Sequence, residues 1–383
     1  MSSESEIVWP SFPPPPAVDE DVVPFPRVVT RSPAAGRNNK KHHFVSVTYM
    51  DGFAADGRVW AYHDDRPDLP QRVRPPTVGY EKFYYSQKLP DGSRENHRFE
   101  DLWGVIEGVW PVTRQALRDR RLSPAISLNT LGMATILRAR VPAARERHEL
   151  LMAAELRGQH QALERMGKLP PELARYAGQL DIVPVAANPQ RSLGKMREDF
   201  AAFHALSFRM GFEVLHAPRG AAFVTSDNPV CWYDPTEPFV DREPYPASGD
   251  IELLFPLDAG MLLRGSTRLV PVNQIVRHRT LVDRAAVRRF NRTIAQFSYR
   301  LLLAQGRCDD LALRHMASSP TVDVAIEHHD KEIRIIVKSL FAPRPRLPLF
   351  VDTPEKAERM QAKMIADGFS DTPMASPEGI IDA

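Results

Sequence analysis

Three features that would place a protein in a class at once are scarce in this sequence: cysteine, net charge and long apolar runs. Its two cysteines, Cys231 and Cys308, are too few for a disulfide framework or a zinc site, and they suit a reducing compartment. The formal net charge of +2 gives no overall attraction to nucleic acid or to an anionic membrane. No apolar run approaches the roughly 20 residues of a membrane helix. We therefore expect a cytoplasmic protein without membrane contact, and the first residues lack the basic and apolar regions of a secretory signal.

Common catalytic motifs are also missing. The sequence has no His-Glu-x-x-His zinc motif, no Walker loop, no Gly-x-Gly-x-x-Gly fingerprint and no Gly-x-Ser-x-Gly elbow. Residues 192–195 match a Ser-x-x-Lys pattern, but the companion motifs of that nucleophile are absent. These absences disfavour zinc proteases, the common nucleotide-binding classes and esterases.

Composition divides the chain into three parts. Residues 1–36 are rich in proline and are predicted to form a disordered arm, either solvated or docked to a partner. Residues 37–340 are predicted to form a single α+β domain, because 43% of the chain is apolar and supplies a sizeable core. Residues 341–383 are a tail with one short helix, since Thr353 and Pro354 are typical of a helix start.

The middle of the chain, from about residue 99 to residue 210, is predicted to be helical. Apolar residues recur there at helical spacing, and Ser123 followed by Pro124 is typical of a helix start. Pro142 begins the next helix, and Pro111 is expected to kink or split the first one.

Strands are predicted on both sides of this helical part. Before it, alternation of apolar and polar residues predicts a strand at residues 45–49. A turn signal at Asp56-Gly57 precedes a second short strand at 59–62, and the aromatic-rich residues 80–86 are predicted to be extended. Residues 67–76 read as a loop. After the helical part we predict hairpins that turn at residues 218–220, 258–260 and 328–331, together with a helix over 283–296 and a strand over 299–304. The expected fold is α+β, with antiparallel strands from both ends of the chain and a central helical insertion.

Residues 221–235 hold the most distinctive local pattern. A β-prone run leads into the polar corner Ser226-Asp227-Asn228-Pro229, and a second apolar run follows. Pro229 disfavours helical backbone at Asn228, and Asp or Asn side chains bond the backbone of the turn in which they lie. The corner therefore presents a carboxylate and an amide where two strands meet, either as a site or only as a turn.

Four short signals along the chain give it a family resemblance. The first is Lys-His-His-Phe-Val at 41–45 with Tyr-Met-Asp-Gly-Phe at 49–53, and the second is Phe-Tyr-Tyr-Ser at 83–86 with Glu100 and Ile-Glu at 106–107. The third is Phe-Val-Thr-Ser-Asp-Asn-Pro-Val at 223–230 with Phe-Pro-Leu at 255–257, and the fourth is Asn291 with Ala295. In this order and spacing, residues 38–305 resemble the bacterial domain of unknown function 4238 family. That resemblance implies no established activity.

Two positions depart from the pattern of that family. The family usually has a proline soon after its histidines, where this chain has Ser46. It often has a tryptophan on the strand before the Ser-Asp corner, where this chain has residues 211–214, Gly-Phe-Glu-Val. Both departures concern how the chain enters a strand.

The first candidate functional residues are His42 and His43. On one strand their side chains point to opposite faces, so at most one easily serves an interior site. His43 shares the face of Val45 and Val47, and we expect it to point inward as a metal ligand or as an acid–base group with a pKa near neutrality. The alternative is a histidine at the mouth of a strand, bonded to a carboxylate.

Glu100 and Glu107 are the next candidates. They are seven residues apart on one predicted helix, so their directions differ by only about 20°. Both border two tryptophans, and indole neighbours raise the pKa of a carboxyl group, which suits a general acid. The alternative is a solvated helix edge that pairs with Arg98 or Arg114. We favour that edge for Glu100 and keep Glu107 as a candidate catalytic residue.

The polar corner and a later helix provide the remaining candidates. If the corner is a site, Asp227 holds a metal, a water or a basic group of a ligand, with Asn228 beside it. Asn291 lies in the middle of a predicted helix, where we expect it to bond strand backbone rather than a ligand. The same helix has a basic face that either meets the phosphates of a nucleic acid or is solvated, formed by Arg284, Arg288, Arg289 and Arg292.

Two functional hypotheses follow. In the first, the chain is a hydrolytic enzyme in which His43, Glu107, Asp227 and Asn228 converge and activate water on a phosphodiester or similar polar substrate. A divalent metal held by His43 and Asp227 is compatible with that chemistry. In the second, the chain is a non-catalytic binding or interaction protein, and the same residues are structural.

Overall fold

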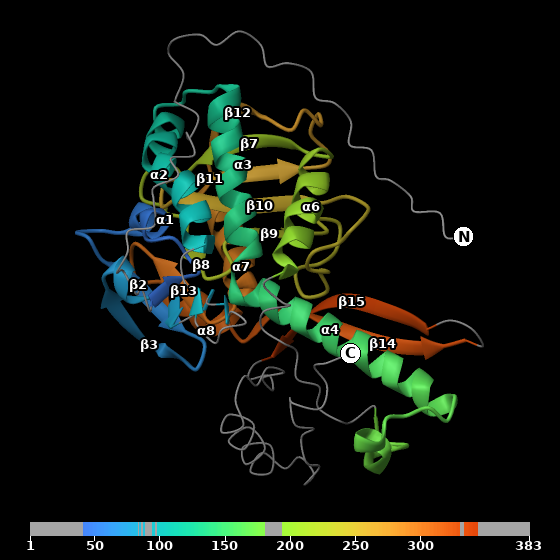
Figure 1. Cartoon of the computed structure of the whole chain (residues 1–383). Helices are drawn as coiled ribbons and strands as arrows, with labels where there is room; N and C mark the ends of the chain where they lie inside the picture. Colours follow the sequence, from blue (N-terminus) through green and yellow to red (C-terminus); the bar gives the residue numbers. More distant parts are fainter. Residues whose placement is uncertain are drawn as a thin grey trace.

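Two β-sheets and the helices packed on them contain the core of the protein (Figure 1). The computed structural model describes residues 41–82, 84–85, 87–88, 94–95, 98–180, 194–329 and 333–343. The predicted arm of residues 1–36 and the predicted helix of the tail lie outside the described residues. The α+β class is confirmed.

The larger sheet has five strands, and most of their side chains are buried. The turn predicted at residues 258–260 is confirmed, since it joins β10 and β11 with Phe255 opposite Leu263. Every strand pair is antiparallel except that of β12 with β7, an edge pairing that the sequence did not indicate. The order across the sheet is β12 (Ile275–Thr280), β7 (Gly211–His216), β11 (Met261–Ser266), β10 (Glu252–Asp258) and β9 (Cys231–Tyr233).

Helices cover one face of this sheet (Figure 1). The helix start predicted at Ser123 is confirmed, because its hydroxyl accepts a hydrogen bond from the amide of Ile126 at 3.2 Å. Of the two outcomes predicted at Pro111, a kink or a split, the split is wrong, since the helix continues through that residue. The helical part contains α2 (Arg98–Arg118), α3 (Pro124–Ala139), α4 (Pro142–Arg165), a 3₁₀ turn (Pro171–Tyr176) and α6 (Met196–Ser207).

The smaller sheet has four strands and includes a correction. Residues 67–76 were expected to be a loop, yet most of them belong to the edge strand β3 (Arg66–Val73). Pro67 and Pro70 are compatible with an edge strand, where a missing N–H leaves no neighbour unpaired. The order is β3, β2 (Val59–His63), β13 (Leu301–Ala304) and β8 (Thr225–Ser226). A hairpin around residues 218–220 is therefore wrong, because β7 and β8 belong to different sheets.

Tyr49 joins the two sheets. The alternating pattern at residues 45–49 predicted a strand, but Tyr49 lies on the short helix α1 (Val47–Met50) and is fully buried. Its hydroxyl donates to the carbonyl of Pro256 in β10 at 2.7 Å and lies 2.7 Å from the hydroxyl of Thr225 in β8. A helical turn and a strand would both point this side chain inward. The apolar pattern of only five residues therefore does not distinguish a helix from a strand.

Gly52, three residues after Tyr49, packs closely against the turn between β10 and β11. Gly52 lies in a 3₁₀ turn (Asp51–Phe53), and a Cβ there would come within 2.9 Å of the Cβ of Asp258. The amide of Ala259 donates to the carbonyl of Gly52 at 3.0 Å. Only glycine lets the β10–β11 turn approach this closely.

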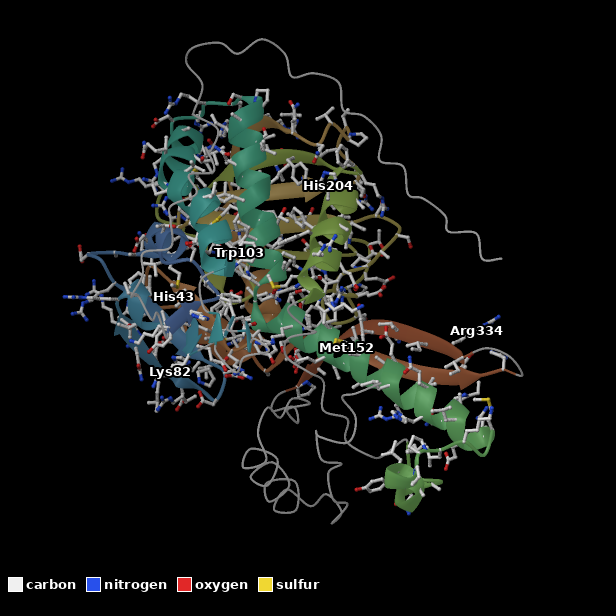
Figure 2. The ribbon with its side chains drawn as sticks, viewed as in Figure 1. His43, Lys82, Trp103, Met152, His204 and Arg334 are labelled. Atoms are coloured by element: carbon white, nitrogen blue, oxygen red, sulfur yellow. The ribbon has the colours of Figure 1, made fainter. Side chains whose placement is uncertain are left out.

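The remaining elements lie around the sheets. Helix α4 and the hairpin of β14 and β15 extend together from the body, with Met152 on α4 and Arg334 on the hairpin (Figures 1 and 2). That hairpin confirms the last predicted one. Among the described residues, no helix is both long and apolar enough to cross a membrane. These elements are β1 (Lys41–His43) paired with β4 (Tyr80–Lys82), β5 (Gln87–Lys88) paired with β6 (Arg94–Glu95), a 3₁₀ turn (Pro75–Thr77), α7 (Arg284–Phe297), α8 (Asp309–His315), β14 (Ser318–His328) and β15 (Ile333–Pro343).

Candidate functional site

The polar corner predicted from the sequence is the place where the chain passes from one sheet to the other. Asp227 follows the last residue of β8 and is 1% exposed. Its carboxylate accepts hydrogen bonds from the backbone amides of Tyr299 at 2.7 Å and Arg300 at 2.8 Å. Its own amide donates to the carbonyl of Leu301 at 2.9 Å. Asp227 thus holds the segment that enters β13.

Asn228 bonds the end of α7 (Arg284–Phe297), the helix that precedes β13. Its side-chain amide donates to the carbonyl of Phe297, the last residue of α7, at 2.9 Å and to the hydroxyl of Tyr245 at 2.6 Å. The residue is completely buried. The two corner residues therefore fix the connection between α7 and β13 from opposite sides.

The prediction for Asn291 is confirmed. Its side-chain oxygen accepts from the amide of Val224 at 3.1 Å, and its side-chain nitrogen donates to the carbonyl of Ala222 at 2.8 Å. A buried amide in the middle of α7 thereby satisfies both polar groups of a strand-like segment that has no ladder partner there.

The histidine pair requires a correction. His42, and not His43, is the inward residue: His42 is completely buried, and its Nδ1 accepts from the amide of Tyr85 at 2.9 Å. His43 is half-buried at the edge of β1, with its Nε2 3.3 Å from the carbonyl of Pro76 (Figure 2). The expectation failed because the chain leaves the strand at residue 43, so the register with Val45 and Val47 does not continue.

The pKa of His43 is shifted by its surroundings. Burial lowers this pKa, and so do the positive charges of Arg140 and Lys41, while the bond to Pro76 and the charge of Glu107 act in the opposite direction. The net direction is downward. The imidazole is therefore neutral near pH 7, and its charge responds to both Glu107 and Arg140.

Glu107 forms an ion pair that the sequence did not predict. Its carboxylate lies 2.5 Å from Nη1 of Arg140, and its side chain is 26% exposed. Arg114, one of the partners expected for this helix edge, instead donates to the carbonyl of Thr48 at 2.8 Å. The side chain of Glu100 lies outside the described residues.

Arg140 is the centre of a buried polar cluster. It ends α3, and only 1% of its side chain is exposed. Its Nε donates to the carbonyl of Phe44 at 3.0 Å and its Nη1 pairs with Glu107, but its Nη2 is buried without a hydrogen-bond partner. An unpaired donor of this kind costs about 1–3 kcal/mol of desolvation.

Arg145 and Tyr84 lie next to it. The guanidinium of Arg145 stacks over the ring of Tyr84 at 4.9 Å, donates to the carbonyl of Tyr84 at 3.2 Å and pairs with Glu149 at 3.1 Å. The hydroxyl of Tyr84 is buried, and no group in the described part of the chain forms a hydrogen bond with it. Burial raises the pKa of this hydroxyl well above its usual value, despite the nearby charge of Arg145, so it stays a donor.

A second pair of arginines extends the cluster. Arg147 lies 3.4 Å from the carboxylate of Asp199, which also bonds His148 at 2.6 Å. Burial alone would raise the pKa of Asp199, but His148 and the neighbouring arginines lower it overall. The guanidinium of Arg138 lies over the rings of Tyr245 at 4.0 Å and Trp232 at 4.9 Å. None of its side-chain nitrogens has a hydrogen-bond partner among the described residues.

A small cavity opens between these groups. Its volume of about 10 Å³ has room for one water-sized sphere. The unpartnered groups of Arg140 and Tyr84 belong to residues that line it, together with Tyr85, Ala139, Arg145, His148 and Met196.

The predicted site residues are thus only partly brought together. His43 and Glu107 are linked electrostatically through Arg140, whereas Asp227 and Asn228 bond the backbone around β13. Among the described residues, no group of three or more His, Cys, Asp or Glu side chains is placed to hold a metal ion.

Sequence reasoning missed the arginine cluster. Its basic members come from residues 138–148, a stretch so rich in charge that helical periodicity predicts a solvated face. The one available signal was Pro142, which predicts a helix start and so places two helix ends among these charges. A cluster formed at a helix junction has no helical period of its own.

The fold and this cluster define an α+β protein with a buried, arginine-lined cavity beside its histidine pair. Residues 41–307, more than half of the chain, match the family described as Protein of unknown function (DUF4238), and the chain belongs to that family. No curated protein and no solved structure matches the chain.

Proposed function

We propose that this chain binds a small anionic ligand, through a phosphate or carboxylate group, in the cavity lined by Arg140, Arg145 and Tyr84. The observation that carries the proposal is the pair of buried donors without partners, Nη2 of Arg140 and the hydroxyl of Tyr84, on residues that line one cavity. One anionic oxygen can accept hydrogen bonds from both. Charge-assisted bonds of this kind are about twice as strong as neutral ones.

The charge balance of the cluster supports an anion. Four buried or partly buried guanidinium groups, of Arg138, Arg140, Arg145 and Arg147, face three carboxylates that pair with them. Arg138 has no carboxylate partner among the described residues. A buried positive excess is costly unless a counter-charge neutralises it.

The size of the cavity restricts the ligand. A space of about 10 Å³ takes one oxygen atom, so only the end of a phosphate or carboxylate group enters and the rest of the ligand stays outside. Arginine suits such a group because its planar fork of donors matches the geometry of both oxyanions.

Thermal unfolding in different anions tests the proposal. A ligand at about 100 times its dissociation constant adds about 2.7 kcal/mol to the free energy of unfolding. We expect inorganic phosphate or acetate to raise the melting temperature by several degrees over chloride at equal ionic strength. Equal melting temperatures in phosphate, acetate and chloride would contradict the proposal.

Hydrolysis is the second candidate function, and the neutral state of the His43 imidazole favours it. A half-buried imidazole with a lowered pKa is able to accept a proton from water near neutral pH. In this candidate His43 is the base, Arg140 binds the anionic group of a phosphodiester or similar substrate, and Glu107 positions Arg140. Asp227 and Asn228 contribute by holding the corner, because the carboxylate of Asp227 and the side-chain nitrogen of Asn228 bond the backbone.

An assay on nitrophenyl phosphate mono- and diesters tests this candidate. The His43→Gln substitution is expected to lower kcat by a factor of about 100 or more, the usual contribution of a general base. His63→Gln, a partly buried histidine on β2, is the control and should keep wild-type activity. No turnover by the wild type, or equal turnover by His43→Gln, would remove hydrolysis as a function of this site.

A further inference from the structure

A second basic surface lies on α7, away from the arginine cluster. The inner side of this helix carries Val287, Asn291 and Ile294 and is buried. Its outer side is exposed and carries four arginines, with two more on the segments beside it. We name this surface the basic α7 face, and its residues are Arg284, Arg288, Arg289, Arg292, Arg219 and Arg314.

The charges of the basic α7 face are not neutralised by the protein. Within the described part of the chain, none of its six guanidinium groups forms an ion pair with a carboxylate. Arg284 instead donates to the carbonyl of Arg219 at 2.9 Å, which brings these two residues together. By contrast, the exposed arginines of β12, Arg277 and Arg279, both bond Glu213.

Two arginines of the basic α7 face act on His315 of α8. Burial lowers its pKa, and the two charged groups that act on it, Arg292 and Arg314, lower it further. Arg292 and Arg314 therefore both lie near His315, at the junction of α7 and α8.

An aromatic ring lies beside the arginines. Phe239 is partly exposed, in the loop that follows β9, and contacts the ring of His315 edge-on with 5.5 Å between centroids. The guanidinium groups of Arg242 and Arg292 lie 5.4 Å and 5.6 Å from its ring. Arg242 also donates to the hydroxyl of Thr293 at 3.0 Å, which fastens this loop to α7.

We propose that the basic α7 face, with Phe239 as a stacking platform, binds single-stranded nucleic acid. Arg284, Arg288 and Arg292 follow one another at four-residue intervals, roughly 6 Å apart along the helix, which suits successive phosphates of one strand. Unpaired bases stack on aromatic rings and on guanidinium planes, and paired bases do not offer their faces. The loop that carries Phe239 also has exposed acids, Glu237, Asp241 and Glu243, whose negative charge limits this surface.

Fluorescence anisotropy with labelled oligo-dT and oligo-U, measured over a range of salt concentrations, tests the proposal. Each phosphate contact on a single strand contributes about 0.7 to the slope of log affinity against log salt. The double variant Arg288→Gln with Arg292→Gln should lower this slope by about 1.4 and weaken binding about 25-fold at about 0.1 M salt. Phe239→Ala should weaken binding about tenfold with an unchanged slope, because stacking releases no counterions.

A matched control separates this surface from net charge. Arg197 on α6 and Lys168 after α4 are exposed and lie outside the basic α7 face, so Arg197→Gln with Lys168→Gln removes the same charge. This control should bind as the wild type does. Equal weakening in the control, no binding by the wild type, or equally tight binding of a labelled poly-glutamate that is insensitive to Phe239→Ala would each overturn the proposal.

Discussion

Asp227 and Tyr84 are both polar and both buried, and they differ in what their oxygens bond. The carboxylate of Asp227 accepts two backbone amides, whereas the hydroxyl of Tyr84 has no partner. A satisfied buried group stabilises the fold, and an unsatisfied one destabilises it until a ligand or water bonds it. This difference leads us to assign a structural role to Asp227 and a binding role to the arginine cluster.

At the scale of single residues, the first prediction concerns Asp227. Asp227→Asn keeps the size of the side chain but removes its charge and one of two acceptors, so we expect a loss of about 2–4 kcal/mol in the free energy of unfolding. Urea unfolding measures it. Asp234→Asn is the control, because Asp234 bonds only the exposed turn at Thr236 and should lose less than about 1 kcal/mol. Unchanged stability in Asp227→Asn would contradict the structural role.

The second prediction concerns the pair of His216 and His278. Nε2 of His216 lies 2.9 Å from Nδ1 of His278, a hydrogen bond that requires one nitrogen without a proton. Burial, Arg120 and His278 lower the pKa of His216 to about 4. The unfolded chain therefore binds more protons than the folded one between about pH 4 and 6.5, and stability is lost as the pH falls through that window.

We expect this loss to reach roughly 2 kcal/mol between pH 6.5 and 4, after allowance for solvent screening. Guanidinium unfolding of the wild type and His216→Gln across this range measures it, and the variant should show the flatter pH dependence. His204→Gln, an exposed histidine on α6, serves as the control. Parallel pH profiles for the wild type and His216→Gln would contradict the prediction.

At the scale of elements, the edge strand β12 depends on one buried carboxylate. Glu213 of β7 is completely buried and bonds Arg277 and Arg279 of β12 at 2.8 Å each, and Arg264 of β11 at 2.9 Å. Burial alone would raise the pKa of Glu213, but these three arginines lower it overall. These ion pairs explain why β12, a strand with exposed arginines, stays paired in parallel with β7.

Substitution of Glu213 tests whether these ion pairs hold β12 on the sheet. Glu213→Gln leaves Arg277 and Arg279 of β12 without the counter-charge of Glu213, while Arg264 keeps its ion pair with Glu252. We therefore expect amide hydrogen exchange in β12 to become faster by about tenfold or more. The β10–β11 hairpin should keep its protection, because its pairing does not involve this carboxylate. Asp250→Asn removes an exposed partner of Arg268 and is the control. Wild-type exchange of β12 in Glu213→Gln would show that backbone pairing alone holds the strand.

The sequence predicted elements better than it predicted their partners. Ser123, Pro124 and Pro142 marked helix starts because capping is a local property, and the turn at residues 258–260 marked a hairpin for the same reason. The assignment of β7 and β8 to different sheets, and the parallel edge strand β12, depend on contacts between distant segments. No local pattern contains that information.

The candidate site was predicted less well, for a related reason. The corner at Asp227 and the role of Asn291 follow from local turn and helix preferences. The burial of Arg140 follows from the packing of α3 against the segment of Phe44 and Tyr85, and that of Arg138 from its contacts with the rings of Trp232 and Tyr245. Charge in a helical stretch predicts exposure, and tertiary packing overrides that prediction here.

At the scale of the whole molecule, distant segments meet at Tyr49, at the polar corner and at the arginine cluster. Tyr49 ties β8 to β10, and the corner residues tie α7 to β13, so both sheets are held rigidly. The arginine cluster lies where β1 and the Tyr84 segment pack on the helical part. Because these parts are fixed by buried bonds, the unpartnered donors of the cluster stay in place for a ligand, which lowers the entropy lost on binding.

The most direct test of that account is calorimetric titration of inorganic phosphate into the wild type and two single-hydroxyl variants. Tyr84→Phe removes an unpartnered hydroxyl, so we predict a free energy of unfolding within about 0.5 kcal/mol of the wild type and phosphate binding weaker by about tenfold. Tyr49→Phe removes a bonded hydroxyl and should show the reverse, a loss of about 1–2 kcal/mol in stability with unchanged phosphate binding. Phosphate that fails to bind the wild type, or that binds Tyr84→Phe as tightly as the wild type, would contradict an anion site at Arg140 and Tyr84.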